Sequence, residues 1–212
     1  YSFLPENIDN YKLEDLINLQ LPFYCLAQLF DFAGQNPIVC CGDVLDKPEI
    51  SDHLLVHLFK KLVNDKNIFY IFGQHDGASK KTFFPYHIAT LFNESQCIHN
   101  KQIKVSLNGF LVTLCGWSYQ PEPYMLQELI KNAKLLPENN YLLFFHQIWE
   151  EFNSQFKFCS FVELLAEFIK DFVCFSGDLH YYKTYICNDH ELFTTSCLYP
   201  ITLSELNSGK SN

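Results

Sequence analysis

Carboxylates, an amide and imidazoles recur in the sequence directly after apolar segments. These side chains are Asp43, Asp46, Gln74, His75, Asp76, His146, Asp178 and His180. Carboxylate oxygen, amide oxygen and imidazole nitrogen together suit Mn²⁺, Fe²⁺ or Zn²⁺. Because no cysteine accompanies them, a structural zinc site is disfavoured. The residue types therefore indicate a transition-metal site.

The segment before each polar group is short, apolar and bounded by turn residues, which is typical of a buried strand. These segments are residues 37–41, 67–72, 141–145 and 172–175. Parallel strands bring their carboxyl ends to one edge of a sheet, so we expect the polar side chains to meet there. Each group also has an ordinary alternative: a turn for the first two, a hydrogen-bonded core-edge histidine for His146, and a surface pair for Asp178 and His180.

Between these strands the apolar spacing predicts helices, and further short strands pair near the middle and the end of the chain. The helices are expected within 12–33, 51–62, 86–93, 124–134 and 161–169, and the strands at 96–99, 103–107, 110–115, 181–187 and 192–195. Asn108-Gly109 predicts a hairpin turn. The sequence therefore predicts a mixed α/β domain of two sheets with helices outside.

Composition limits the classes of function. The chain has 212 residues, 48% apolar and 18% charged, and it carries a net charge of −9 with lysine as its only basic type besides histidine. A chain this acidic does not coat nucleic acid, although bound cations can offset site carboxylates locally. Nine cysteines without C-x-x-C spacing predict reduced, buried thiols in an intracellular protein. We expect a cytoplasmic location, with a nuclear or a phage-encoded protein as alternatives, and no membrane partner.

The four polar segments occur in the order of known motifs. They are GDVLD at 42–46, GQHD at 73–76, the histidine of FFHQ and GDLH at 177–180. This order resembles the calcineurin-like metallophosphoesterase superfamily, whose motifs are G-D-x-x-D, G-N-H-D/E, a lone H and G-H-x-H. The resemblance covers residues 12–205 and implies a two-sheet, four-layer α/β/β/α fold. GDVLDKPEIS, GQHD and TSCLYP are most similar to SbcD-type DNA-repair nucleases, including the phage versions.

The resemblance implies a role for each residue. Asp43 would bridge two metal ions, with Gln74, His146 and Asp178 at the second ion and His180 at the first. His75 would be catalytic, protonating the leaving oxygen or stabilising the transition state, and Asp76 would orient it. Asp46 is expected to be structural. Manganese is the expected metal of a two-metal centre in the complete protein, with iron or zinc as alternatives.

Several positions depart from the family pattern. Gln74 replaces asparagine, Asp178 replaces histidine and Ser196 replaces glycine. The first two changes favour a harder cation such as Mn²⁺. The N-terminal D-x-H motif is not found and the sequence begins at Tyr1, so we expect residues 1–205 to be an N-terminally truncated domain, followed by a polar tail at 206–212. Without D-x-H, we expect the 212 residues alone to bind one metal ion at the second site, or none firmly, and to be inactive.

The implied function is metal-dependent hydrolysis of phosphodiester bonds in DNA. An SbcC-type coiled-coil ATPase and a second copy of the chain are the implied protein partners. Two alternatives remain open at this stage. One is a phosphatase or phosphodiesterase of the same superfamily that acts on small substrates. The other is a metal-free scaffold that keeps the fold, as the retromer subunit of this superfamily does.

Overall fold

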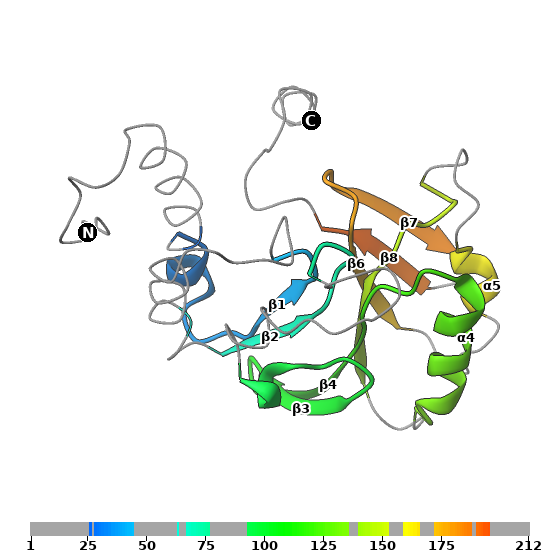
Figure 1. Cartoon of the computed structure of the whole chain (residues 1–212). Helices are drawn as coiled ribbons and strands as arrows, with labels where there is room; N and C mark the ends of the chain where they lie inside the picture. Colours follow the sequence, from blue (N-terminus) through cyan, green and yellow to red (C-terminus); the bar gives the residue numbers. More distant parts are fainter. Residues whose placement is uncertain are drawn as a thin grey trace, which may run out of the picture.

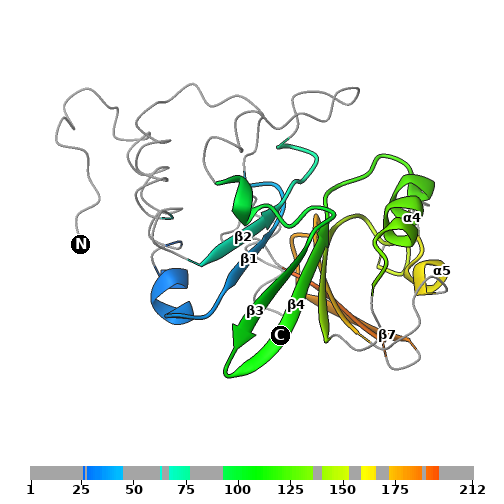
Figure 2. The same ribbon diagram turned by 90° about the horizontal axis from the view of Figure 1, so that it is seen from below.

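Two β-sheets pack face to face in the computed structural model, and helices cover their outer faces (Figure 1, Figure 2). The structure describes residues 26, 28–44, 63, 67–76, 93–135, 140–152, 159–165, 172–187 and 190–195. The smaller sheet pairs β1 (Ile38–Cys41) with β2 (Ile68–Ile71). The larger sheet has the order β3-β4-β5-β6-β8-β7. Its strands are β3 (Gln102–Leu107), β4 (Phe110–Trp117), β5 (Tyr141–His146), β6 (Val173–Gly177), β7 (Lys183–Cys187) and β8 (His190–Thr194).

Strand direction brings the site-bearing ends together. β1 runs parallel to β2, and β4, β5, β6 and β8 are parallel neighbours in the larger sheet. His146 pairs in register with Gly177, so the ends of β5 and β6 are level with each other. β3 and β7 are antiparallel to β4 and β8 at the two edges. The predicted hairpin turn is confirmed, with positive φ at Asn108 and Gly109.

Three apolar layers separate the elements, because side chains alternate between the two faces of each strand. Between the sheets lie Cys41, Phe69, Ile71, Ile98, Leu114 and Phe144. Ile68 and Tyr70 point the other way, toward Phe30 of the helical segment 28–33. On the far face of the larger sheet, Cys115, Leu143 and Cys174 pack beneath the outer helices. The two-sheet, four-layer arrangement predicted from the sequence is therefore confirmed.

The outer helices are α4 (Pro123–Asn132) and α5 (Phe161–Leu165), both on the larger sheet (Figure 2). Proline in the first turn of α4 fits a helix start, where its missing N–H leaves no intrahelical bond unmade. Leu126 and Ile130, four residues apart, bury one face of this helix. No helix in the described part of the chain is long and apolar enough to cross a membrane.

Some predicted boundaries are wrong. β4 continues two residues beyond the predicted strand 110–115, so that Trp117, which lies outside every predicted strand and helix, is buried in the core. Residues 96–99 were expected to form a strand, but they contain the end of a 3-10 turn, η2 (Glu94–Gln96), followed by isolated bridges at Cys97 and His99. The predicted helix at 51–62, residues 86–92 of the predicted helix at 86–93, and the tail 206–212 lie outside the described residues.

Candidate metal site

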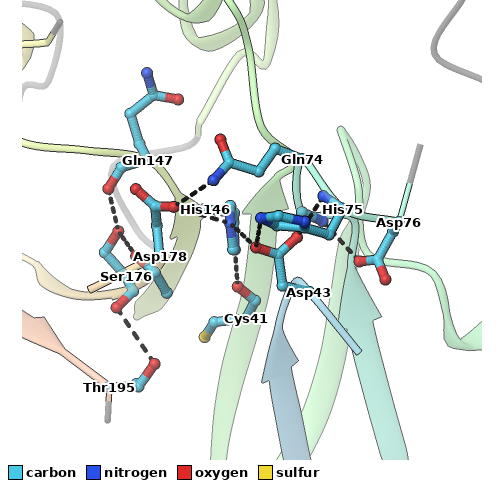
Figure 3. Close-up of polar contacts among 12 residues, drawn as sticks. Cys41, Asp43, Gln74, His75, Asp76, His146, Gln147, Ser176, Asp178 and Thr195 are labelled. Carbon is cyan, nitrogen blue, oxygen red and sulfur yellow. Dashed lines mark hydrogen bonds and ion pairs between the residues drawn. The ribbon is translucent and has the colours of Figure 1, made fainter. Parts of the chain in front are cut away.

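The site lies where the ends of both sheets meet (Figure 3). Asp43 follows β1 of the smaller sheet, His146 ends β5 and Asp178 follows β6. One side-chain ligand atom from each of these three residues lies within 4.8 Å of the others, which is close enough to bind one cation together. The sequence predicted a site along the edge of a single sheet. This prediction is wrong, because one carboxylate comes from the opposite sheet.

His146 is oriented by the main chain of β1. Its Nδ1 lies 2.6 Å from the carbonyl oxygen of Cys41. A carbonyl oxygen can only accept, so Nδ1 carries the proton and Nε2 points toward the carboxylates. Nε2 is 3.1 Å from Asp43 Oδ2 and 3.6 Å from Asp178 Oδ1. Although buried, Nε2 has no hydrogen-bond partner with suitable geometry among the described residues. The arrangement fits a metal ligand whose other ring nitrogen is held by a backbone carbonyl.

Electrostatics favour a positive charge at the centre of this cluster. Burial lowers the pKa of His146, but the carboxylates of Asp178 and Asp43 outweigh it and raise the pKa to about 10. Burial also raises the pKa of Asp43, yet His146 and the backbone N–H of His75 bring it below its ordinary value. The raised pKa favours a proton on His146 beside the two carboxylates, and a divalent cation could take the place of that proton.

Gln74 contacts the cluster, whereas His180 lies outside it. Gln74 Nε2 donates to Asp178 Oδ1 at 3.0 Å (Figure 3). Turning the amide by 180° would present its oxygen instead, as the predicted ligand role requires. His180 is exposed and lies outside the Asp43–His146–Asp178 cluster. The structure thus brings three of the predicted ligands together, places Gln74 against one of them, and leaves the role of His180 a prediction.

The turn after β2 carries His75 and Asp76. The backbone N–H of His75 donates to Asp43 Oδ1 at 2.7 Å, and its Nε2 lies 4.0 Å from Asp43 Oδ2. Half of the His75 side chain is exposed, so it borders the cluster on the solvent side. Asp76 is fully buried and accepts from the backbone N–H of Gly73 at 2.8 Å. Asp76 therefore closes the turn that positions His75.

Glycines allow a close approach of the backbone at the site, two of them between the sheets and one within the smaller sheet. A Cβ on Gly177 would lie 2.1 Å from the Cys41 carbonyl oxygen, and one on Gly73 would lie 2.0 Å from Asp43 Oδ1. A Cβ on Gly42 would lie 2.3 Å from His146 Nδ1, and Gly42 also has a φ of +87°. Sequence reasoning recognised only the turn at Gly42. The available signal was that three of the four motifs begin with glycine.

Both carboxylates of the cluster have left-handed backbones. The φ angle is 50° at Asp43 and 83° at Asp178. This conformation costs an ordinary residue about 1–2 kcal/mol, although aspartate and asparagine tolerate it better than most. Strain of this kind concentrates at functional sites. Each carboxylate is thus aimed inward by a backbone conformation that is unfavourable by itself.

Two other histidines have structural surroundings. His99 Nδ1 accepts from the backbone N–H of Ser118, and the His190 ring packs 4.6 Å from that of Phe172. Asp46 and Ser196 lie outside the described residues.

Comparison with known proteins finds solved structures with a similar fold. No protein-family model and no curated protein matches the sequence. Among solved structures, TT1561 of Thermus thermophilus is similar, with 13% identity and a TM-score of 0.60 over 84% of this chain and 85% of that one. The phosphopantetheinyl hydrolase PptH from Mycobacterium tuberculosis is similar with 9% identity and a TM-score of 0.54, covering 82% of each chain.

The fold is of the metallophosphoesterase type. At these identities the likeness is one of fold, and the chemistry must be argued from the residues. In this metallophosphoesterase-type fold, Asp43, His146 and Asp178 form a candidate site for a metal whose identity the geometry leaves open.

Proposed function

We propose that this protein is a metal-dependent hydrolase that cleaves phosphodiester bonds, with DNA as its substrate. The observation that carries the proposal is the buried Nε2 of His146, which faces two carboxylates and lacks a hydrogen-bond partner in the part of the chain that the structure describes. A divalent ion held by Asp43, His146 and Asp178 would lower the pKa of a bound water and stabilise negative charge on a phosphate. His75, exposed beside Asp43, would protonate the leaving oxygen.

Charge balance at the site supports a phosphodiester. Two carboxylates and one divalent ion sum to zero when His146 is neutral. A diester brings one negative charge, whereas a monoester near neutral pH brings up to two. The sequence also contains no arginine, the side chain that best pairs with a phosphate dianion. A nearly neutral site with few cations therefore favours the monoanionic diester.

The choice of DNA rests on the motifs. GDVLD and GQHD are similar to the motifs of SbcD-type nucleases, which act on DNA. Because the chain is acidic, it is unlike proteins that hold DNA by general electrostatic attraction. A partner that delivers DNA ends fits this charge, and an SbcC-type coiled-coil ATPase is the partner that the resemblance suggests. A homodimer and an intracellular location belong to the same proposal.

Two other functions have an observation in their favour. The name of the similar phosphopantetheinyl hydrolase supports a small phosphoester as substrate. A metal-free scaffold is favoured by the raised pKa of His146, because a protonated imidazole offsets one of the two carboxylate charges without any ion. Metal binding separates the scaffold from the enzymes, and substrate preference separates the enzymes from each other.

The test combines a metal titration with a substrate panel. The 212-residue chain is titrated with Mn²⁺ and then assayed on linear duplex DNA, single-stranded DNA, bis-p-nitrophenyl phosphate and p-nitrophenyl phosphate. The sequence alone indicated an inactive chain, but the structure groups three ligands around one position, so we expect one bound ion and activity. We expect cleavage of DNA and of the diester, little cleavage of the monoester, and more activity in Mn²⁺ than in Mg²⁺. Preference for the monoester would support the small-substrate alternative. Absence of Mn²⁺ binding would support the scaffold.

A further inference from the structure

The loop at residues 118–120, between β4 and α4, is fastened to the end of β2. The backbone N–H of Tyr119 donates to the carbonyl oxygen of Phe72 at 2.9 Å. The backbone N–H of Phe72 donates in turn to Ser118 Oγ, also at 2.9 Å. Phe72 immediately precedes the turn that carries Gln74 and His75. The loop therefore keeps a fixed position relative to this part of the site.

A second attachment joins the same loop to the residue that follows His146. The backbone N–H of Gln120 donates to Gln147 Oε1 at 3.4 Å, and Gln147 Nε2 donates to the Gln120 carbonyl oxygen at 3.3 Å. Gln120 and Gln147 are both buried, as is Ser118. Tyr119 is thus a partly exposed residue between two buried neighbours, and its backbone is anchored on both sides.

The Tyr119 ring lies beside the metal cluster. It meets the His146 ring edge to face, with 6.4 Å between the ring centroids and an interplanar angle of 77°. A phenol is a hydrogen-bond donor that carries no charge at neutral pH, so this ring brings a neutral donor next to the cluster.

We propose that Tyr119 is a substrate-binding residue that donates a hydrogen bond from its hydroxyl to a non-bridging oxygen of the phosphoryl group, and that Gln147 positions it. The inference rests on the proposed function and adds a phosphate donor to it. Asp43 and Asp178 repel a phosphate, and arginine is missing from the sequence. A phenol donates without adding charge, and its anchored backbone reduces the entropy lost on binding.

The test measures phosphate binding instead of turnover. Inorganic phosphate is titrated by calorimetry into Mn²⁺-loaded wild type and Tyr119→Phe, after the Mn²⁺ affinity of each has been determined. We expect Tyr119→Phe to bind Mn²⁺ as wild type does and phosphate about tenfold more weakly, since one hydrogen bond to a charged group is lost. The matched control is Tyr124→Phe, because Tyr124 is 63% exposed in α4. This control should leave both affinities unchanged.

Gln147 is tested by a double-mutant cycle. Gln147→Ala should weaken phosphate binding in the wild-type background but not in Tyr119→Phe, because its effect passes through the Tyr119 hydroxyl. Equal weakening in both backgrounds would show a general structural effect and overturn the positioning role. Mn²⁺ affinity is measured for every variant, since Gln147 is adjacent to His146.

The outcomes distinguish the inference from the function on which it rests. If wild type binds phosphate only with Mn²⁺ and Tyr119→Phe binds it equally well, the role of Tyr119 is overturned and the proposed function stands. If wild type shows no Mn²⁺-dependent phosphate binding, both are overturned. Loss of Mn²⁺ binding in Tyr119→Phe would also overturn the inference, because the residue would then support the metal site.

Discussion

The two sheets contribute differently to the site. The larger sheet supplies His146 and Asp178, whose side chains are 1% and 7% exposed. The smaller sheet supplies Asp43, 18% exposed, and the turn carrying His75, 50% exposed. The buried side chains suit the holding of an ion, and the exposed imidazole suits contact with a substrate. Metal affinity and turnover should therefore depend on different residues.

The surroundings of the ligands in the larger sheet support this division. Behind His146, the rings of Trp117, Phe145, Trp149 and Phe161 form a continuous aromatic cluster, with successive centroids 5.2, 5.4 and 5.6 Å apart. Trp149 also donates from Nε1 to Ser176 Oγ at 2.8 Å, which links β6 to the segment after β5. The larger sheet is thus rigid where its ligands emerge, because close-packed cores resist deformation.

The largest effect is expected from Asp43, the one carboxylate of the cluster that comes from the smaller sheet. Asp43→Asn removes the charge that faces His146 Nε2 at 3.1 Å. We expect Mn²⁺ affinity to fall by more than about 100-fold, beyond the usual cost of losing an outer-shell partner. Activity should fall to background. Calorimetry and the DNA assay measure the two effects, and Asp31→Asn, on an exposed part of the helical segment, is the control. Unchanged affinity in Asp43→Asn would break the cluster as described.

Gly177→Ala should separate the two sheets. The added Cβ would lie 2.1 Å from the Cys41 carbonyl oxygen, so β1 and β6 must move apart. We expect a loss of about 3 kcal/mol in the free energy of unfolding, the upper end for overpacking. In a chain of this length that corresponds to a fall of about 6–12 °C in Tm. Gly109→Ala is the control, because no atom of the described residues beyond its chain neighbours lies within 4 Å of its Cβ and only its φ of +85° is unfavourable. Equal destabilisation of both variants would argue against close contact of the sheets.

His75→Ala tests the solvent-exposed side of the site, which the turn after β2 contributes. The His75 imidazole lies 4.0 Å from Asp43 and outside the metal cluster. We expect the rate to fall about 100-fold, the usual contribution of a general acid, while Mn²⁺ affinity stays unchanged. Single-turnover kinetics with saturating Mn²⁺ measure the rate. A parallel loss of metal binding and activity would show that metal binding and turnover do not depend on different residues.

The pH dependence of metal binding should show the smallest effect. A cation must displace the His146 proton, whose pKa is about 10, so Mn²⁺ affinity should rise about tenfold per pH unit below that value. The stability of the metal-free protein has the opposite trend and falls as the pH rises. The folded pKa lies above the unfolded value of 6.5, so this contribution is fully present below pH 6.5 and is lost as the pH rises through 10. Titrations and thermal melts at about pH 6 and about pH 7.5 test both trends, and pH-independent Mn²⁺ affinity would contradict them.

Much of the fold was predictable because its signals are local. Apolar runs ending in Gly-Asp or Gly-Gln-His identified β1, β2 and β6. Strand pairing could not be predicted in this way, because it joins segments far apart in the chain and neither segment alone shows which partner it pairs with. The sequence therefore could not show that Asp43 and His146 come from opposite sheets. Trp117 was misplaced for a related reason: its burial depends on stacking with Phe145, a residue of another strand.

The site was predictable to a similar extent. Residue types identified Asp43, His146 and Asp178, because few side chains bind metals well. Contacts of the main chain are independent of residue type, so the carbonyl oxygen of Phe72 and its bond to Tyr119 could not be found. Tyr119 and Gln147 were missed because an isolated tyrosine or glutamine gives no signal of its own. Their positions depend on a loop whose course only the structure reveals.

The hydrogen bond from His146 to the Cys41 carbonyl has a consequence for mutational scanning. Replacing Cys41 by alanine removes a buried thiol but leaves the carbonyl oxygen in place, so a side-chain scan would rank this position as dispensable for the site. The orientation of the His146 imidazole nevertheless depends on this carbonyl oxygen. An amide-to-ester substitution in the backbone of β1, which weakens a carbonyl as an acceptor, would reveal a determinant that no amino-acid replacement can isolate.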